Sequence, residues 1–380
     1  MVVNIEGLVS GGRGIAHRNG KTIFVTNALP GESVDIIVDK ERKGFAEAHV
    51  LSYDATSSDR VVPSCPYFGI CGGCDFLYVT EKRSAELKEE IVKDNLKRIA
   101  KLDHLPEFLP PAYSTFNGYR SRCRVHVDLR NKRQGFLSQG SNELVDIPSC
   151  PALADKLNGI ISERGGELFR IARSLMFENK VNKTTGFVEV PLFSGDRVVS
   201  TGQDAVSVTV NDIQYKVSAN VFFQSNLKVL PKLFEFVVSN TVGENIMDLY
   251  SGVGTFSALF EGSGRNVYAV ERQKECLALS RINAPGAISY TSDVASWARK
   301  SKVAVDTVIV DPPRVGLEAG VADMISSWNP KRIIYISCNS VTAARDIPLF
   351  SGYMLTKAQI FDFYPGSGHE ESGFVLEKMS

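Results

Sequence analysis

The sequence predicts an α/β protein in three parts: a small N-terminal β-barrel, a central α+β region and a C-terminal doubly wound sheet. From about residue 225, short apolar strands alternate with helical segments, which is typical of a doubly wound sheet. Before residue 55, short alternating strands are separated by Gly, Pro and Asn turns, which indicates a barrel. We therefore expect units at 1–55, 56–223 and 224–380, with parts of the middle unit packing on the last.

The barrel prediction depends on three alternating segments, Thr22–Thr26, Val34–Val38 and Ala46–Leu51. The stretch SGGRGIAHRNGK adds basic side chains to glycine-rich loops, which suits either an RNA backbone or a solvated loop. Residues 81–102 have apolar side chains at helical spacing, which predicts a helix after the cysteine loop.

Composition limits the class of partner and the location. The chain has 380 residues, with 43 basic and 43 acidic side chains, so a nucleic acid would have to be bound by a local basic patch. No signal peptide and no apolar stretch of about 18 residues is present, so we expect a cytoplasmic protein without a membrane segment. Stable disulfides among the seven cysteines are then not expected.

Four cysteines suggest a metal centre. Cys65, Cys71 and Cys74 lie in the compact loop SCPYFGICGGCDF, and Cys150, which also precedes a proline, is the best fourth partner. Three close cysteines plus one remote cysteine favour an iron-sulfur cluster. Zinc and unligated thiols are the alternatives, although zinc ligands more often occur as two C-x-x-C pairs.

A basic strand is predicted in the middle region. In YRSRCRVHVDLRNKR, Arg120, Arg122 and Arg124 alternate with smaller residues, which places the three guanidinium groups on one face. Such a face suits phosphate binding, and an exposed strand with solubilising charges is the alternative.

The C-terminal region contains two loops that suit a nucleotide-bearing ligand. Five strands are predicted, at 245–249, 266–270, 287–290, 307–310 and 332–336. The first strand ends in DLYSGVGT and the second ends in Val270-Glu271. Glu271 is an acidic residue about 20 positions after the glycine loop and can bind ribose hydroxyls. The third glycine of the dinucleotide pattern is missing, and Asp248 suits a cationic amino-acid moiety, so S-adenosylmethionine fits better than NAD. The Asp311-Pro312-Pro313-Arg314 motif follows the fourth strand, beside the same predicted cleft.

Cys338 follows the fifth strand, in IIYISCNS, and is a candidate nucleophile. The β-prone run before it places the thiol at the end of a buried strand, where open α/β sheets bind ligands. An inert buried cysteine is the alternative.

These motifs resemble a known family. D-P-P-R-x-G, then sixteen residues, then I-I-Y-x-S-C-N-x-x-T is similar to the signature of the RNA uracil-5-methyltransferases. The likeness covers nearly the whole chain, with a TRAM-like barrel, a cluster-bearing central domain and a class I, Rossmann-like methyltransferase domain that uses S-adenosylmethionine. It implies that Cys65, Cys71, Cys74 and Cys150 hold a 4Fe-4S cluster.

The resemblance also implies catalytic roles. Cys338 would add to carbon 6 of a uracil and thereby activate carbon 5, and Glu371 in GHEESGF would remove the proton from carbon 5. The family pattern selects Glu371 over its neighbour Glu370, because the glutamate stands two residues after the histidine. The target uridine must be unpaired or flipped out.

Cofactor and RNA contacts follow from the same resemblance. The methyl donor would be bound by Gln224, Tyr250, Gly252, Thr255, Glu271, Asp293 and Asp311. Two positions depart from the family: Ser251 replaces a common cysteine, and Thr255 stands where several members have asparagine. RNA would be bound by Arg120, Arg122, Arg124 and Arg314.

The layout favours 23S ribosomal RNA as the substrate, with the T-loop uridine of transfer RNA as the alternative. Alternatives from other classes are a non-catalytic Fe-S RNA-binding protein, an Fe-S base-excision enzyme and a cytosine methyltransferase, which usually has its cysteine in the proline loop. A monomer without an obligate protein partner is expected.

Overall fold

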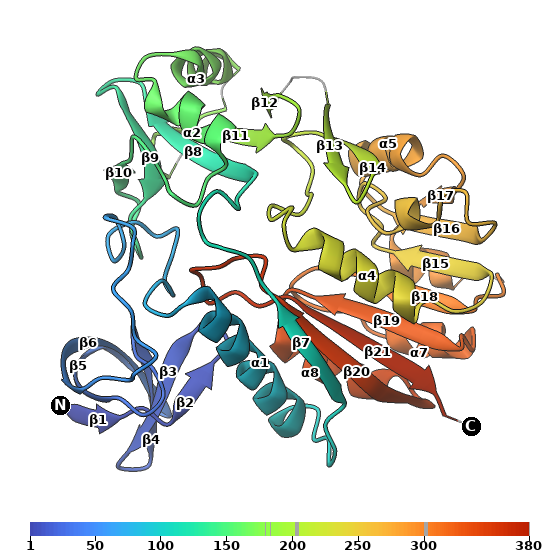
Figure 1. Ribbon diagram of the computed structural model, residues 1–380, viewed down its shortest axis with the longest axis horizontal. Helices are drawn as coiled ribbons and strands as arrows, with labels where there is room; N and C mark the ends of the chain where they lie inside the picture. The colour runs from blue at the N-terminus through green and yellow to red at the C-terminus, as the bar shows by residue number, and fades with distance from the viewer. Residues whose placement is uncertain (179, 183, 202–204, 300–302, 380) are drawn as a thin grey trace.

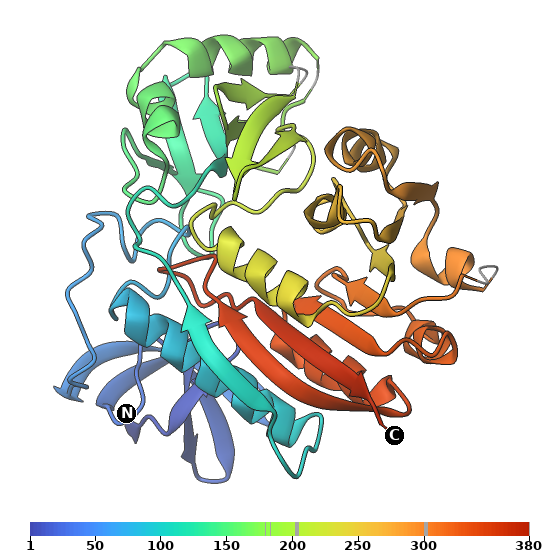
Figure 2. The same cartoon turned by 45° about the vertical axis from the view of Figure 1, so that its right-hand side comes forward.

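The computed structural model describes residues 1–178, 180–182, 184–201, 205–299 and 303–379. The N-terminal barrel, the central region and the C-terminal sheet lie around α1 (Glu81–Arg98), which runs between the barrel and the sheet in both views (Figures 1 and 2). Within the described residues, no helix is long and apolar enough to cross a membrane.

The N-terminal unit is a curled six-stranded sheet with strand order β1-β5-β6-β4-β3-β2. The three predicted segments fall within β4, β5 and β6, so this prediction is confirmed. Alternate side chains such as Val34 and Ile36 point into its core. Its strands are β1 (Val2–Asn4), β2 (Gly7–Val9), β3 (Arg13–Arg18), β4 (Lys21–Thr26), β5 (Ser33–Glu41) and β6 (Phe45–Ala55).

The central region contains a five-stranded antiparallel sheet of order β10-β9-β8-β11-β12, covered on one face by two helices. A separate hairpin, β13–β14, leads towards the C-terminal sheet. The elements are β8 (Arg122–Asp128), β9 (Arg133–Leu137), β10 (Leu144–Asp146), α2 (Asp155–Ser162), α3 (Glu167–Phe177), β11 (Val188–Ser194), β12 (Val198–Ser200), β13 (Val206–Val210) and β14 (Ile213–Val217).

The C-terminal unit is built on an eight-stranded sheet of order β17-β16-β15-β18-β19-β21-β20-β7. All five predicted strands are present within one or two residues, and they pair in parallel. The strands are β7 (Glu107–Ala112), β15 (Asn245–Leu249), β16 (Asn266–Glu271), β17 (Ile288–Thr291), β18 (Thr307–Val310), β19 (Arg332–Ser337), β20 (Tyr353–Phe361) and β21 (Ser372–Lys378).

Helices cover both faces of this sheet, as expected for a doubly wound fold. Along β19, Ile334 and Ile336 pack on the face covered by α4, whereas Ile333 and Tyr335 pack on the opposite face, which α1 covers. The other elements are α4 (Leu230–Asn240), η1 (Ser257–Phe260), α5 (Lys274–Asn283), α6 (Val294–Ala298), α7 (Val321–Ser327), α8 (Ser340–Asp346) and η2 (Ile347–Leu349).

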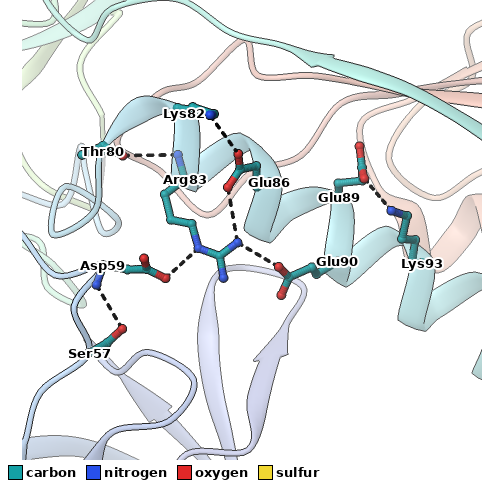
Figure 3. Close-up of polar contacts among 9 residues, drawn as sticks. All are labelled: Ser57, Asp59, Thr80, Lys82, Arg83, Glu86, Glu89, Glu90 and Lys93. Atoms are coloured by element: carbon teal, nitrogen blue, oxygen red, sulfur yellow. Dashed lines mark hydrogen bonds and ion pairs between the residues drawn. The ribbon is translucent and has the colours of Figure 1, made fainter.

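The middle segment contributes both α1 and the edge strand β7 to this unit. At its start, α1 is capped by Thr80, and Arg83 pairs with Asp59 and Glu90, which joins the helix to the chain that leaves the barrel (Figure 3). The predicted boundaries at residues 55 and 223 stay a prediction.

A buried ion pair fastens α1 to the sheet. Lys88 Nζ lies 2.7 Å from Asp362 Oδ1, and both side chains are fully buried. The same carboxylate accepts hydrogen bonds from Ser84 and from the backbone N–H of Tyr364. Because Asp362 directly follows β20, the pair fixes the start of the segment that leads to Glu371.

We predict that Lys88→Met destabilises the protein by about 3–5 kcal/mol, because Asp362 would be left as an unpaired buried charge. The midpoint of urea unfolding measures this loss. Lys82→Met is the matched control, since Lys82 pairs with Glu86 at the exposed surface of the same helix (Figure 3) and its loss should cost at most about 1 kcal/mol. Equal effects of the two substitutions would contradict the structural role of the buried pair.

Candidate active site

Cys338 lies directly after β19, at the carboxyl end of the parallel strands. Residues 333–336 of this strand are fully buried, and Asn339 caps the following helix α8 by accepting a hydrogen bond from the N–H of Val341. The predicted position of the thiol at the end of a buried strand is therefore confirmed.

Strand β21, the antiparallel neighbour of β19, brings Glu371 to the same edge of the sheet as Cys338. Ser337 pairs with Ser372, so continuing the register by one residue sets Cys338 opposite Glu371. The Glu371 side chain is 4% exposed, and its backbone carbonyl accepts a hydrogen bond from the N–H of Phe361. Two groups 33 positions apart in the sequence thus meet at one sheet edge.

The structure distinguishes the two adjacent glutamates. Glu371 belongs to the described lining of the cavity that also contains Cys338, whereas Glu370 does not. Glu370 Oε1 instead accepts a hydrogen bond of 2.6 Å from the hydroxyl of Ser340. This geometry favours Glu371 as the group that can reach a ligand beside Cys338.

A cavity of about 340 Å³ lies at this edge of the sheet. This volume is suited to a small ligand together with one reacting group of a second molecule. The residues to which the family resemblance assigns catalysis or cofactor binding all line it: Gln224, Tyr250, Gly252, Thr255, Glu271, Asp293, Asp311, Cys338 and Glu371.

The glycine loop after β15 is shaped for close contact with a ligand. Tyr250 and Gly252 both have positive φ, at 60° and 54°, and the N–H of Gly252 donates to Glu271 Oε2. Gln224 Oε1 and Ser251 Oγ are buried and have no hydrogen-bond partner among the residues that the structure describes. Unpartnered buried polar atoms that face a cavity indicate a site for a polar ligand.

Two acidic residues that were expected to contact the cofactor make hydrogen bonds within the protein. Asp248, expected to meet a cationic moiety, is fully buried and accepts hydrogen bonds from the N–H and hydroxyl of Ser257, outside the described cavity lining. Asp293 lines the cavity but also caps α6 through the N–H of Ser296, and this bond lowers the pKa of Asp293.

Negatively charged groups are concentrated at this site. Burial, followed by the charge of Asp248, raises the pKa of Asp311 to about 7. Burial also raises the pKa of Glu371 well above its ordinary value, and Asp311 and Glu370 add to this effect. Burial, Glu371 and Asp311 raise the pKa of Cys338 to about 12, against the opposing charge of Arg314. A cationic ligand would relieve this repulsion and favour the thiolate.

The four predicted metal ligands line a second cavity of about 690 Å³ in the central region. Cys65, Cys71, Cys74 and Cys150 are free thiols there. The loop is held against β9 by a hydrogen bond from Gly72 N–H to the Leu137 carbonyl. Among the described residues, no three or more His, Cys, Asp or Glu side chains are arranged closely enough to hold a metal ion. The four thiols thus share one cavity, but as they stand they do not form a closed metal site.

The predicted arginine row lies on this second cavity. Arg120, Arg122 and Arg124 line it, and so does Cys123. Along β8, Arg122 and Arg124 alternate with the buried Cys123 and Val125, as predicted, whereas Arg120 lies before the strand begins. Arg314 instead lines the first cavity, where its guanidinium lies 2.8 Å from His369 Nδ1.

Several lining residues were not predicted from the sequence. Phe222 borders both cavities and is 58% exposed, so the arginine row and the Cys338 site adjoin at this ring. Glu318 lines the first cavity and bonds to the hydroxyl of Tyr250. Cys276 also lines it. The aromatic pair before Gln224 was a usable signal for Phe222, whereas nothing near Glu318 in the sequence points to the site.

The parallel sheet, the glycine loop after β15 and the acidic end of β16 define a class I S-adenosylmethionine-dependent methyltransferase fold. The structure of Pyrococcus abyssi tRNA (uracil-54, C5)-methyltransferase in complex with S-adenosyl-L-homocysteine has this fold. It superposes with a TM-score of 0.74 at 23% identity, over 99% of this chain and 100% of the other.

Two family models match parts of the sequence. Residues 298–379 match the model described as tRNA (uracil-5-)-methyltransferase, and residues 1–51 match the TRAM domain. The 23S rRNA (uracil(1939)-C(5))-methyltransferase RlmD of Methylococcus capsulatus is 28% identical over 100% of this chain and 97% of its own length. The RlmD protein of Neisseria lactamica is 29% identical over 99% and 95%. The chain is thus similar to RNA uracil-5-methyltransferases along its whole length, and its N-terminal part matches a TRAM domain.

We predict that Glu371→Gln lowers the pKa of Cys338, because it removes the nearest negative charge that raises it. At pH values above the raised pKa of Glu371, alkylation of Cys338 by iodoacetamide should become faster, by up to roughly tenfold, the effect of one pKa unit. Peptide mapping of the alkylated protein measures the rate at this cysteine.

The control for this experiment is Glu377→Gln, near the far end of β21, where Glu377 pairs with Arg332. It should leave the pH dependence unchanged. An unchanged profile in Glu371→Gln would contradict the electrostatic coupling of Glu371 and Cys338.

Proposed function

We propose that this chain methylates carbon 5 of a uridine in 23S ribosomal RNA, through a covalent bond between Cys338 and the uracil ring. The observation that carries the proposal is the register of β19 and β21, which brings a thiol and a carboxylate together in a cavity beside the glycine loop. The target base has to leave its stack to enter this cavity.

The reaction begins at Cys338. Carbon 5 of uracil is a weak nucleophile, so the thiolate sulfur forms a bond to carbon 6 and the electrons of the ring double bond become available at carbon 5. Since burial and two carboxylates hold the pKa of Cys338 high, the thiol has to pass its proton to solvent as its sulfur adds to carbon 6. Bound S-adenosylmethionine supplies the methyl group as an electrophile, and its positive charge would favour the thiolate.

Glu371 completes the reaction. Its carboxylate takes the proton from carbon 5, the ring double bond re-forms, and the bond between carbon 6 and sulfur breaks to return the Cys338 thiolate. The raised pKa of Glu371 makes it a stronger base than an exposed glutamate once it is ionised.

The methyl donor would be held by residues around the same cavity. The unpartnered Gln224 Oε1 and Ser251 Oγ suit its polar groups, and Glu271 at the end of β16 suits ribose hydroxyls. Asp311 suits the positively charged part of the donor. Tyr250, Thr255 and Asp293 complete the proposed contacts.

We predict that Glu371→Gln accumulates a covalent protein–RNA adduct in the presence of S-adenosylmethionine, because the carbon 5 proton can no longer be removed. Turnover should fall by at least roughly a hundredfold, the usual worth of a general base. Denaturing gel electrophoresis with labelled RNA detects the adduct. The double variant Cys338→Ala/Glu371→Gln should form none, and normal release by Glu371→Gln would show that another group is the base.

The proposed substrate is supported by the names of relatives that match along the whole chain, the RlmD proteins, which act on 23S rRNA. A transfer RNA substrate is the second candidate, since the structural neighbour acts on uracil 54 of tRNA. The proposed location of the protein is the cytoplasm.

Mapping of 5-methyluridine in RNA from a strain that lacks this protein should show the loss of the modification in 23S rRNA, with tRNA unchanged. Re-expression of the wild-type chain should restore it, and the Cys338→Ala variant should not. Loss confined to tRNA would instead support the second candidate.

We further propose that Cys65, Cys71, Cys74 and Cys150 hold a 4Fe-4S cluster. The support is a set of four free thiols on one cavity, next to the arginine row and away from Cys338. The methylation involves no electron transfer, so the role of the cluster would be to fold the central region and shape the RNA surface.

We predict that protein purified without oxygen contains iron and acid-labile sulfide in equal amounts, and that Cys150→Ser loses most of both. The loss should also lower the thermal midpoint, because the cysteine loop and the Cys150 loop would no longer be joined. Cys123→Ser, at a buried position of β8, is the control and should retain iron. Zinc in the wild type would contradict the cluster.

A further inference from the structure

Glu370 is a buried carboxylate that the proposed reaction does not use. Its side chain is 4% exposed. Oε1 accepts a 2.6 Å hydrogen bond from the Ser340 hydroxyl and lies 3.4 Å from the Ser340 backbone N–H. A buried charge without partners is costly, so the Ser340 bonds hold this side chain in one place.

Ser340 connects Glu370 to the nucleophile. It is the first residue of α8 and lies two positions after Cys338, so the turn Cys338-Asn339-Ser340 is held at its far end by the carboxylate. Glu370 is also the direct sequence neighbour of Glu371. One side chain therefore joins the segment of the thiol to the segment of the base, beyond the last backbone pair of β19 and β21, Ser337 with Ser372.

The hydrogen bonds continue to the barrel. Asn95 Nδ2, on α1, donates to Ser340 Oγ at 2.8 Å and to Ser10 Oγ at 3.0 Å, and Ser10 lies in the turn between β2 and β3. Gly368 packs so closely on this turn that a Cβ atom there would lie 2.4 Å from the carbonyl of Gly11. The barrel turn thus packs against the segment that carries Glu370 and is linked through Asn95 to its partner Ser340.

We propose that Glu370 is a positioning residue for the methylation: by bonding Ser340 it keeps the Cys338 turn and the Glu371 segment in a fixed mutual position. This inference depends on the function proposed above. Without the bond, the two segments would move independently, and the thiol and the carboxylate would seldom be aligned on one uracil. A misplacement of about 1 Å costs on the order of a hundredfold in rate.

Glu370→Ala and Ser340→Ala test the proposal as single and double variants. Each single substitution should lower kcat for RNA methylation roughly ten- to hundredfold, with the KM values for RNA and S-adenosylmethionine changed less than about twofold. Because both remove the same bond, the double variant should be no slower than the slower single variant. Effects that multiply in the double variant would overturn the proposal.

Glu370→Gln is the conservative variant. It retains the acceptor oxygen for Ser340, so it should recover most of the wild-type kcat and melt close to the wild type. Glu377→Ala, which removes an exposed carboxylate of β21, is the control and should leave kcat unchanged. A wild-type kcat in Glu370→Ala, or a Glu370→Gln variant as slow as Glu370→Ala, would overturn the role of this hydrogen bond.

Alkylation of Cys338 by iodoacetamide gives a second readout that needs no RNA. A looser turn should change the rate at Cys338 severalfold in Glu370→Ala and Ser340→Ala, and not in Glu377→Ala. An unchanged rate would overturn the inference even if the protein had another substrate. Absence of methyl transfer by the wild type, with altered Cys338 reactivity in the variants, would refute the proposed function and leave the positioning role intact.

Discussion

The pairing of β21 with β19 is the constraint on which the site depends. A doubly wound sheet places the ends of its parallel strands along one edge, but parallel strands alone leave Cys338 without a partner there. The antiparallel strand arrives at the same edge from the opposite direction, so the residue before it, Glu371, meets the residue after β19. A register shift of one residue would turn Glu370 to the cavity in its place.

Helix α1 supports this arrangement although it comes from the middle of the chain. Lys88 fixes the start of the segment 362–371 through Asp362. Asn95 lies two turns further along the same face of α1 and donates a hydrogen bond to Ser340, two residues after Cys338. Both contacts connect the catalytic edge to the barrel side of the molecule. The TRAM domain is therefore joined to the active site by packing and hydrogen bonds, rather than by a linker alone.

Much of the fold and of the site could be predicted from the sequence, because short-range sequence patterns indicate both. The apolar runs of the five parallel strands, the glycine loop and the motif around Cys338 are all short-range patterns. The strands β20 and β21 were not predicted: β21 is buried on both faces and gives no alternating pattern, and its neighbours in the sheet are set by long-range pairing. For the same reason Lys88 looked like an ordinary charged residue of a surface helix.

The role of Glu370 could likewise not be predicted, since its hydrogen bond to Ser340 joins two segments that are distant in the sequence. The glycine-rich barrel loop gave a mixed signal. It suited RNA by its basic residues, yet Gly12 packs on Gly368 and Phe76 in the structure. Close backbone packing between distant segments leaves the same glycine pattern in a sequence as a ligand-binding loop does.

The central claim is that Cys338 attacks carbon 6 and that release waits for removal of the carbon 5 proton. RNA that contains 5-fluorouridine tests it directly with the wild-type chain, because fluorine at carbon 5 cannot be taken by Glu371 as a proton is. The account predicts a denaturation-resistant adduct that forms only with S-adenosylmethionine, carries one transferred methyl group and maps to Cys338 by mass spectrometry. Methylated free RNA without an adduct, or an adduct at another cysteine, would contradict it.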